Sequence, residues 1–190
     1  MIYTSYFSNL KNIPKDYVAI SISLRQPKGF NLVEYKKLAP TPYILKEYKI
    51  YADSTIYTAN YEALILDNLN PQKVVDELYE IAMNLLHKTS KEDINIVLVC
   101  WEKEKFCHRH LVARWINNNT EEKVKEYPYI KTYKLPLIDG KRIEIKATSL
   151  KEAIIKFTEE HSELILEGQN ETNSLEDLVD YYFWEYDLDY

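Results

Sequence analysis

Residues 94–109 read Ile94-Asn95-Ile96-Val97-Leu98-Val99-Cys100-Trp101-Glu102-Lys103-Glu104-Lys105-Phe106-Cys107-His108-Arg109, and this stretch decides the fold. The most strand-like run in the chain comes first, because its apolar residues are mostly β-branched. The polar residues after it predict a turn, and a helix is expected to begin near Cys107. Apolar residues then recur at helical spacing until residues 117–119: Leu111, Val112, Trp115 and Ile116. Open α/β sheets bind ligands outside the carboxyl ends of their strands, so we expect the functional site here.

Strands and helices alternate in the pattern on the N-terminal side of this stretch. Residues 2–7 and 17–23 are rich in β-formers and predict two strands. Helical spacing predicts one helix after Asp53 and another after Asn70, with Pro71 at its first position. The alternation indicates the α/β class.

Two intermediate segments have weaker patterns. Residues 30–38 predict a short helix that ends before Pro40 and Pro42, because a residue that precedes proline is pushed out of helical geometry. Residues 43–51 are expected to be extended or mixed.

The C-terminal third predicts an appendage to this α/β part. Asp139-Gly140 lies between two β-rich arms, which is a strong hairpin signal, and Ser149 with Glu152 forms a capping box at the start of a helix. We therefore expect an α/β domain over residues 1–120, a hairpin-helix extension over residues 121–170, and an acidic aromatic tail over residues 171–190.

Composition narrows the functional classes. The chain has 190 residues, of which 46% are hydrophobic and 28% charged, which is typical of a globular protein. It has only three glycines and no glycine-rich phosphate loop, so no dinucleotide or nucleotide cofactor is expected. The net charge is −6, but seven acids lie in the last twenty residues, so the rest is nearly neutral. This charge does not indicate general electrostatic attraction to nucleic acid, although it is compatible with a local basic groove.

The start of the chain has neither a basic segment nor a long apolar run, and no stretch approaches the length of a membrane span. We expect a cytoplasmic protein with no membrane partner. The two cysteines do not form a disulfide framework, so free thiols are expected in a reducing compartment.

The candidate catalytic residues are Cys107, Glu102 and His108. A cysteine in the first turn of a helix meets the positive end of the helix dipole, which favours the thiolate. Cys107 is thus a candidate nucleophile, with Glu102 at the strand end as general acid or base. The alternative is that Cys107 is a small buried residue at a strand-helix corner, and Cys100 is expected to point into the core.

Arginines are the candidate ligand-binding groups. Arg109 is suited to a phosphate or carboxylate, and Arg25 follows a predicted strand that would reach the same crevice if it is parallel to the one ending at Cys100. Lys28, Lys36 and Lys37 extend a possible basic rim. The alternative for all of these bases is an ordinary solvated surface.

Two other site types fit the sequence less well. Cys100, Cys107, His108 and His110 offer metal ligands, but the six-residue gap between the cysteines is not the usual knuckle spacing, so no metal is expected. A cysteine phosphatase needs an arginine six positions after its cysteine, and this chain has Ala113 there. It also lacks the glycines that let a loop wrap around phosphate.

The residues Cys100-x-Glu102 and Cys107-His108-Arg109, followed by the helix sequence His-Leu-Val-Ala-Arg-Trp, resemble the bacterial and viral family known as domain of unknown function 488. Ser5 and the segment that ends in Arg25 and Pro27 are similar too. The resemblance covers about residues 2–116. It implies a Rossmann-like, three-layer α/β fold with a mostly parallel sheet, and it adds Ser5 to the candidate ligand-binding residues.

The chain departs from that family at two places. Many members carry an aspartate shortly before the strand-end arginine, where this chain has Ser21 and Ser23. The gap between Cys100 and Cys107 is also one residue shorter than in many relatives.

The leading hypothesis is a small enzyme that acts on a nucleotide, nucleobase or nucleic-acid component through Cys107, Glu102 and Arg109. Its expected partner is a small anionic or nucleotide-like ligand, with nucleic acid as a further possibility. One alternative is a binding module that uses the same crevice without turnover. Another is an interaction protein that works through the acidic tail at residues 171–190.

Overall fold

The computed structural model describes residues 1–103, 106–128, 130–136 and 142–160. Contacts divide the chain into two compact units, Met1–Tyr127 and Pro128–Tyr190. The first unit contains all the predicted site residues and extends past the expected boundary at residue 120.

The first unit is built on a five-stranded sheet with the order β3-β2-β4-β1-β5, in which every described pair of strands is parallel. The strands are β1 (Ile2–Tyr6), β2 (Val18–Ser21), β3 (Val33–Glu34), β4 (Ile96–Cys100) and β5 (Lys125–Glu126). The register places Tyr6 opposite Cys100 and Ser21 opposite Val99. The carboxyl ends of β1, β2 and β4 therefore lie together at one edge of the sheet.

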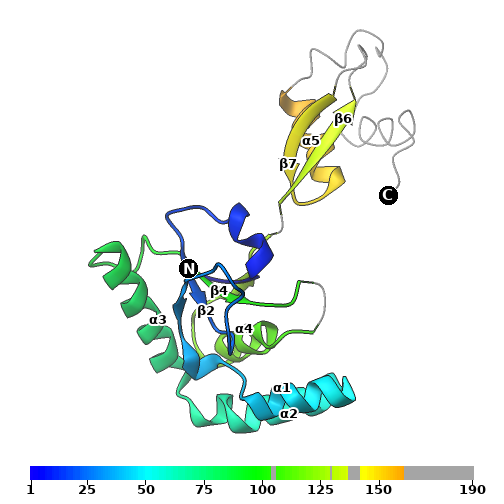
Figure 1. Ribbon diagram of the computed structural model, residues 1–190. Helices are drawn as coiled ribbons and strands as arrows, with labels where there is room; N and C mark the ends of the chain where they lie inside the picture. The colour runs from blue at the N-terminus through cyan, green and yellow to red at the C-terminus, as the bar shows by residue number, and fades with distance from the viewer. Residues whose placement is uncertain (104–105, 129, 137–141, 161–190) are drawn as a thin grey trace. The chain divides into compact units, whose positions relative to one another are not determined.

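Four α-helices belong to this unit: α1 (Pro42–Tyr51), α2 (Ser54–Leu64), α3 (Pro71–Leu86) and α4 (His108–Asn119). The helices α3 and α4 contact β4, and α1 lies beside α2 (Figure 1). Side chains alternate across a strand, so Ile96, Leu98 and Cys100 of β4 enter the core shared with these helices.

The opposite face of the sheet has a smaller core. Val97 and Val99 of β4 pack there against Phe7, which begins the 3-10 helix η1 (Phe7–Asn12). The sheet thus lies between a layer of α-helices and a layer formed by η1 and the residues around it. The predicted Rossmann-like α/β class is confirmed. Within the described ranges, no helix is long and apolar enough to cross a membrane.

Two of the predicted elements are wrong. Residues 43–51 lie in α1, because the Thr41 side chain accepts a hydrogen bond from the Ile44 backbone N–H and Pro42 occupies the first turn. Pro42 therefore starts a helix instead of excluding one. Residues 30–38 form the short strand β3 and the 3-10 helix η2 (Lys36–Leu38), since pairing with β2 holds Val33 extended.

The start of α3 follows its sequence signals, and its stability can be tested. The Asn70 side chain accepts a hydrogen bond from the Lys73 backbone N–H at 2.9 Å. Asn70→Ala is expected to lower the free energy of unfolding by about 1 kcal/mol, whereas Asn70→Asp retains the cap. Urea unfolding of the two variants measures the difference. Equal stability of Asn70→Ala and wild type would show that the cap contributes nothing.

The second unit contains β6 (Lys131–Pro136), β7 (Arg142–Ala147) and α5 (Leu150–Glu160). The two strands pair antiparallel and α5 packs on them through Ile154 and Phe157, so the predicted hairpin and helix are confirmed. The Ser149 hydroxyl accepts from the Glu152 backbone N–H, whereas the Glu152 carboxylate accepts from the Thr148 backbone N–H. The turn at Asp139-Gly140 and the acidic tail lie outside the described residues.

Candidate functional site

A pocket of about 620 Å³ lies where the chain leaves β2 and β4. The segments Ser23–Arg25 and Cys100–Glu102 line it together with Cys107 and His108, and residues of α1 and α2 form its other wall. This is the crevice expected at the carboxyl ends of parallel strands. Cys107, His108, Glu102 and Arg25 are therefore brought together as the sequence predicts.

Two thiols and an imidazole form the buried floor of the pocket. Cys100 is the last residue of β4 and faces the helices, and Cys107 is the N-cap of α4. Cys100, Cys107 and His108 are each 4% exposed, and their sulfur and ring nitrogen atoms all lie within 4.8 Å of one another. The end of β4 and the start of α4 thus bring the three side chains into one cluster.

The orientation of His108 follows from its hydrogen bonds. Its Nε2 lies 3.0 Å from the carbonyl oxygen of Ile22, and because a carbonyl only accepts, Nε2 carries the hydrogen. In the neutral ring this leaves Nδ1 as an acceptor, and the Cys100 Sγ lies 3.5 Å from it. The Tyr61 ring, 5.2 Å away between centroids, packs against the imidazole. The Cys100 Sγ also lies 3.7 Å from Nε2, so the sulfur packs beside the imidazole ring and does not lie in line with the Nδ1 lone pair.

The two thiols have opposite pKa shifts. The pKa of Cys107 lies well below its ordinary value, first because the Cys100 thiol donates a hydrogen bond to its sulfur. Contributions of the same sign come from His108 and the backbone amide of Arg109, while burial opposes them. The pKa of Cys100 is raised by the same hydrogen bond and by burial. Cys107 is thus the thiolate and Cys100 the donor.

Arg109 is 1% exposed and supports the segment that follows β4. Its Nε donates to the Glu126 carboxylate at 3.0 Å, and its terminal nitrogens donate to the carbonyls of Glu102 and Lys103. The guanidinium also lies over the Tyr6 ring. Arg109 is not among the described residues that line the pocket. Its guanidinium holds the backbone beside the pocket, whereas the sequence predicts that it contacts a ligand.

Ser5 is also not among the described residues that line the pocket. Its side chain is buried, and its hydroxyl accepts a hydrogen bond from the Asn9 side chain at 3.0 Å. Asn9 belongs to η1, so Ser5 connects β1 to the layer opposite the helices. The alternation of side chains across β1 determines this direction.

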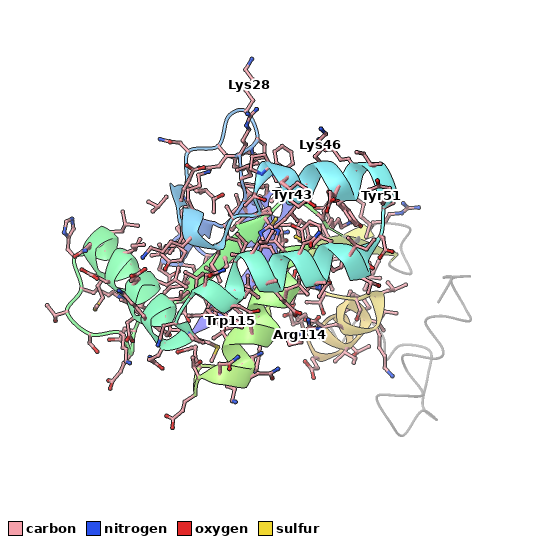
Figure 2. The ribbon with its side chains drawn as sticks, turned by 90° about the horizontal axis from the view of Figure 1, so that it is seen from below. Lys28, Tyr43, Lys46, Tyr51, Arg114 and Trp115 are labelled. Carbon is pink, nitrogen blue, oxygen red and sulfur yellow. The ribbon has the colours of Figure 1, made fainter. Side chains whose placement is uncertain are left out.

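The rim of the pocket is basic and its wall aromatic. Arg25, Lys46 and Lys49 face it with Glu102 as the acidic counterpart, and the three rings of Tyr48, Tyr57 and Phe106 pack within 5.7 Å of one another. Two of the lysines predicted for the rim are not among the described pocket residues: Lys36 forms an ion pair with Glu34, and Lys37 forms one with Glu77. Lys28 projects on the same side of the molecule as Lys46 (Figure 2).

Sequence reasoning missed the contribution of α1 to the pocket. Leu45, Tyr48 and Lys49 recur at three-to-four spacing, which places them on one side of the helix. That spacing indicates a shared face if the segment is helical. In the extended segment predicted over residues 43–51, these side chains would point to opposite sides.

The same cluster supplies the ligands that could hold a metal. Cys100, Cys107 and His108 converge in spite of the unusual spacing, because Cys100 comes from the strand and the other two from the start of α4. His110, the fourth candidate in the sequence, is exposed, and its Nε2 lies 3.9 Å from the Glu126 carboxylate.

The comparison with protein families gives one match. The family model described as DUF488-N3a, active DUF488-N3 subclade, matches residues 3–120, which is more than half of the chain. Neither the curated proteins nor the solved structures include a significant match. The matched region contains β1 to β4, the pocket and the Cys-His-Arg sequence at residues 107–109. The chain therefore belongs to the DUF488 family, within the subclade DUF488-N3a.

Proposed function

We propose that the protein is a small enzyme that acts on a nucleotide, nucleobase or nucleic-acid component. The observation that carries the proposal is the convergence of Cys107, His108 and Glu102 on one pocket with a basic, aromatic rim. Nucleophile, base and acid groups in a concave site at strand ends are the features expected of an active site. The description of the subclade as active agrees with this proposal.

The proposed catalytic groups are a buried thiol and imidazole, Cys107 and His108, and an exposed acid, Glu102. The Cys100 thiol donates to the Cys107 sulfur and His108 lies beside both, so Cys107 can attack an electrophilic atom of the ligand as a thiolate. Glu102 is exposed at the pocket and can exchange a proton with the leaving group. Arg109 acts as a positioning residue, because it binds the carbonyl of Glu102.

The rim indicates the class of ligand. Among the described residues that line the pocket, the bases Arg25, Lys46 and Lys49 outnumber the one acid, Glu102, so the pocket favours an anionic group. The rings of Tyr48 and Phe106 offer apolar surface for a planar base. A phosphate joined to a nucleobase combines both features.

The test uses the four ribonucleoside 5′-monophosphates and a short single-stranded oligonucleotide as substrates, with products followed by chromatography in chelator-treated buffer. Conversion of at least one substrate is expected in wild type. Cys107→Ser and Glu102→Gln should each lower kcat by roughly 10²–10⁴-fold, which is the usual contribution of a positioned acid or base. Arg25→Ala should raise KM by about tenfold, as expected for a lost charge-assisted hydrogen bond.

Glu121→Gln is the matched control, because Glu121 is exposed and is not among the pocket residues. A substrate converted equally well by wild type and Cys107→Ser would exclude the cysteine as nucleophile. The binding-module alternative draws support from the 4% exposure of Cys107, which restricts attack on a bulky ligand. Binding of a nucleotide that Arg25→Ala weakens, with no product in any assay, would favour that alternative.

A further inference from the structure

The buried cluster of Cys100, Cys107 and His108 has the donor set of a transition-metal site. We propose that these three residues bind a zinc-like divalent cation through the two sulfurs and His108 Nδ1, with a fourth position open to the pocket. This inference goes beyond the proposed function, because thiolate chemistry at Cys107 needs no metal.

The distances fit a tetrahedral site. Zinc bonds of about 2.3 Å to sulfur and 2.0 Å to nitrogen place the two donor atoms about 3.5 Å apart at the tetrahedral angle. The Cys100 Sγ and His108 Nδ1 lie 3.5 Å apart. The three donor atoms all lie within 4.8 Å, so small side-chain rotations bring the remaining pairs to bonding positions.

A hydrogen bond that would orient the histidine ligand is also in place. A histidine that binds a metal usually donates its other ring N–H to a carboxylate or a backbone carbonyl, which fixes the ring. Here His108 Nε2 donates to the Ile22 carbonyl at 3.0 Å, which leaves Nδ1 as the nitrogen that can bind a cation. All three side chains are nine-tenths or more buried, so the ligands are held by the surrounding core.

The donors select the class of cation. Two thiolates and one imidazole suit Zn²⁺ and other soft or borderline ions, whereas Mg²⁺ and Ca²⁺ prefer oxygen ligands. Three protein ligands beside a pocket leave the fourth position for water or for an anionic group of a ligand.

Cation binding weakens Cys107 as a nucleophile, because the metal withdraws electron density from the sulfur. The metal-bound form of the protein therefore reacts more slowly with electrophiles, and removal of the cation restores the free thiolate. The site would couple the chemistry of Cys107 to the supply of a thiophilic cation.

The decisive experiment is titration of the reduced, metal-free full-length protein with Co²⁺, whose spectrum reports its ligands. Thiolate-to-cobalt charge-transfer absorption and the intense visible bands of tetrahedral Co²⁺ are expected to saturate at about one ion per chain. The chain has only two cysteines, so the charge-transfer band can arise only from Cys100 and Cys107. Added Zn²⁺ should abolish both sets of bands. Their absence in folded wild type overturns the proposal.

His108→Ala should weaken Co²⁺ binding by more than the roughly 10–100-fold that is lost when a group hydrogen-bonded to a metal ligand is removed. His110→Ala is the matched control, since His110 lies on the same helix but is exposed and outside the cluster. Equal weakening by the two variants would also overturn the proposal. Circular dichroism of each variant verifies that it is folded.

Protection from iodoacetamide separates this proposal from the proposed function. Zn²⁺ should slow alkylation of Cys107 by at least about tenfold, and chelator should reverse the effect. Alkylation that is fast with and without Zn²⁺ contradicts the metal site but leaves the nucleophile intact. Protection by Zn²⁺ in a protein that converts no nucleotide supports the metal site and contradicts the enzyme.

Discussion

Iodoacetamide is expected to alkylate Cys107 with a pH-rate profile whose midpoint lies at lower pH than the value of about 8.5 for an ordinary thiol. An ordinary thiol, with a pKa of about 8.5, would react roughly tenfold more slowly for each pH unit below that value. The pKa of Cys107 is lowered, first by the hydrogen bond from Cys100, so the thiolate should persist to lower pH than in an ordinary thiol. Peptide mapping by mass spectrometry, in chelator, measures the rate.

Substitution of Cys100 tests the cause of this shift. Cys100→Ser keeps an O–H donor beside Cys107 and leaves one reporting thiol, so the midpoint of the alkylation profile should remain below that of an ordinary thiol. Cys100→Ala removes the donor, and the midpoint of the rate profile should move to higher pH. Identical profiles for the two variants would show that Cys100 does not stabilise the thiolate. An inert thiol in both would point to burial as the dominant effect.

Arg109→Ala is expected to lower the free energy of unfolding of the first unit by about 2–4 kcal/mol. The guanidinium is buried, satisfies Glu126 and the carbonyls of Glu102 and Lys103, and packs on the Tyr6 ring. Its loss leaves a cavity and unpaired acceptors. The loss is smaller than for a fully buried ion pair, because the Glu126 side chain is 41% exposed and water can reach it. Urea unfolding followed by the fluorescence of Trp101 and Trp115 measures the change.

Arg114→Ala provides the control on the same helix. The exposed Arg114, labelled in Figure 2, forms an ion pair with Glu62 at 2.8 Å, and its loss should cost less than about 1 kcal/mol. A cost for Arg109→Ala as small as that for Arg114→Ala would mean that the network around Arg109 does not stabilise the fold.

The fold class could be predicted because its main elements have strong local signals. The strands at residues 2–7, 17–23 and 94–99 are rich in β-forming residues, and the start of α3 carries both an N-cap and a proline. The region between Gly29 and Tyr51 was harder, because Pro40 and Pro42 can end one helix or start another. The Thr41 cap, together with the packing of α1 on α2, decides between these.

The candidate site was predictable in part for a related reason. The order of strand, turn and helix places Cys107 and Glu102 at a sheet edge, and parallel pairing of β2 with β4 brings Arg25 to the same pocket. The roles of Arg109 and Ser5 depend on their surroundings. The guanidinium of Arg109 meets Glu126, and Ser5 meets Asn9, on elements that no local pattern joins to them.

By itself, the sequence determined the α/β class, the helix that begins after Cys107 and the position of the crevice, because apolar period and capping residues act over short stretches of chain. Only the tertiary structure decided which side chains meet. The face of β4 on which Cys100 lies, the carbonyl that orients His108 and the acceptors that surround Arg109 come from separate elements. Contacts of this kind depend on strand register and on packing between distant segments, and both are properties of the folded chain as a whole.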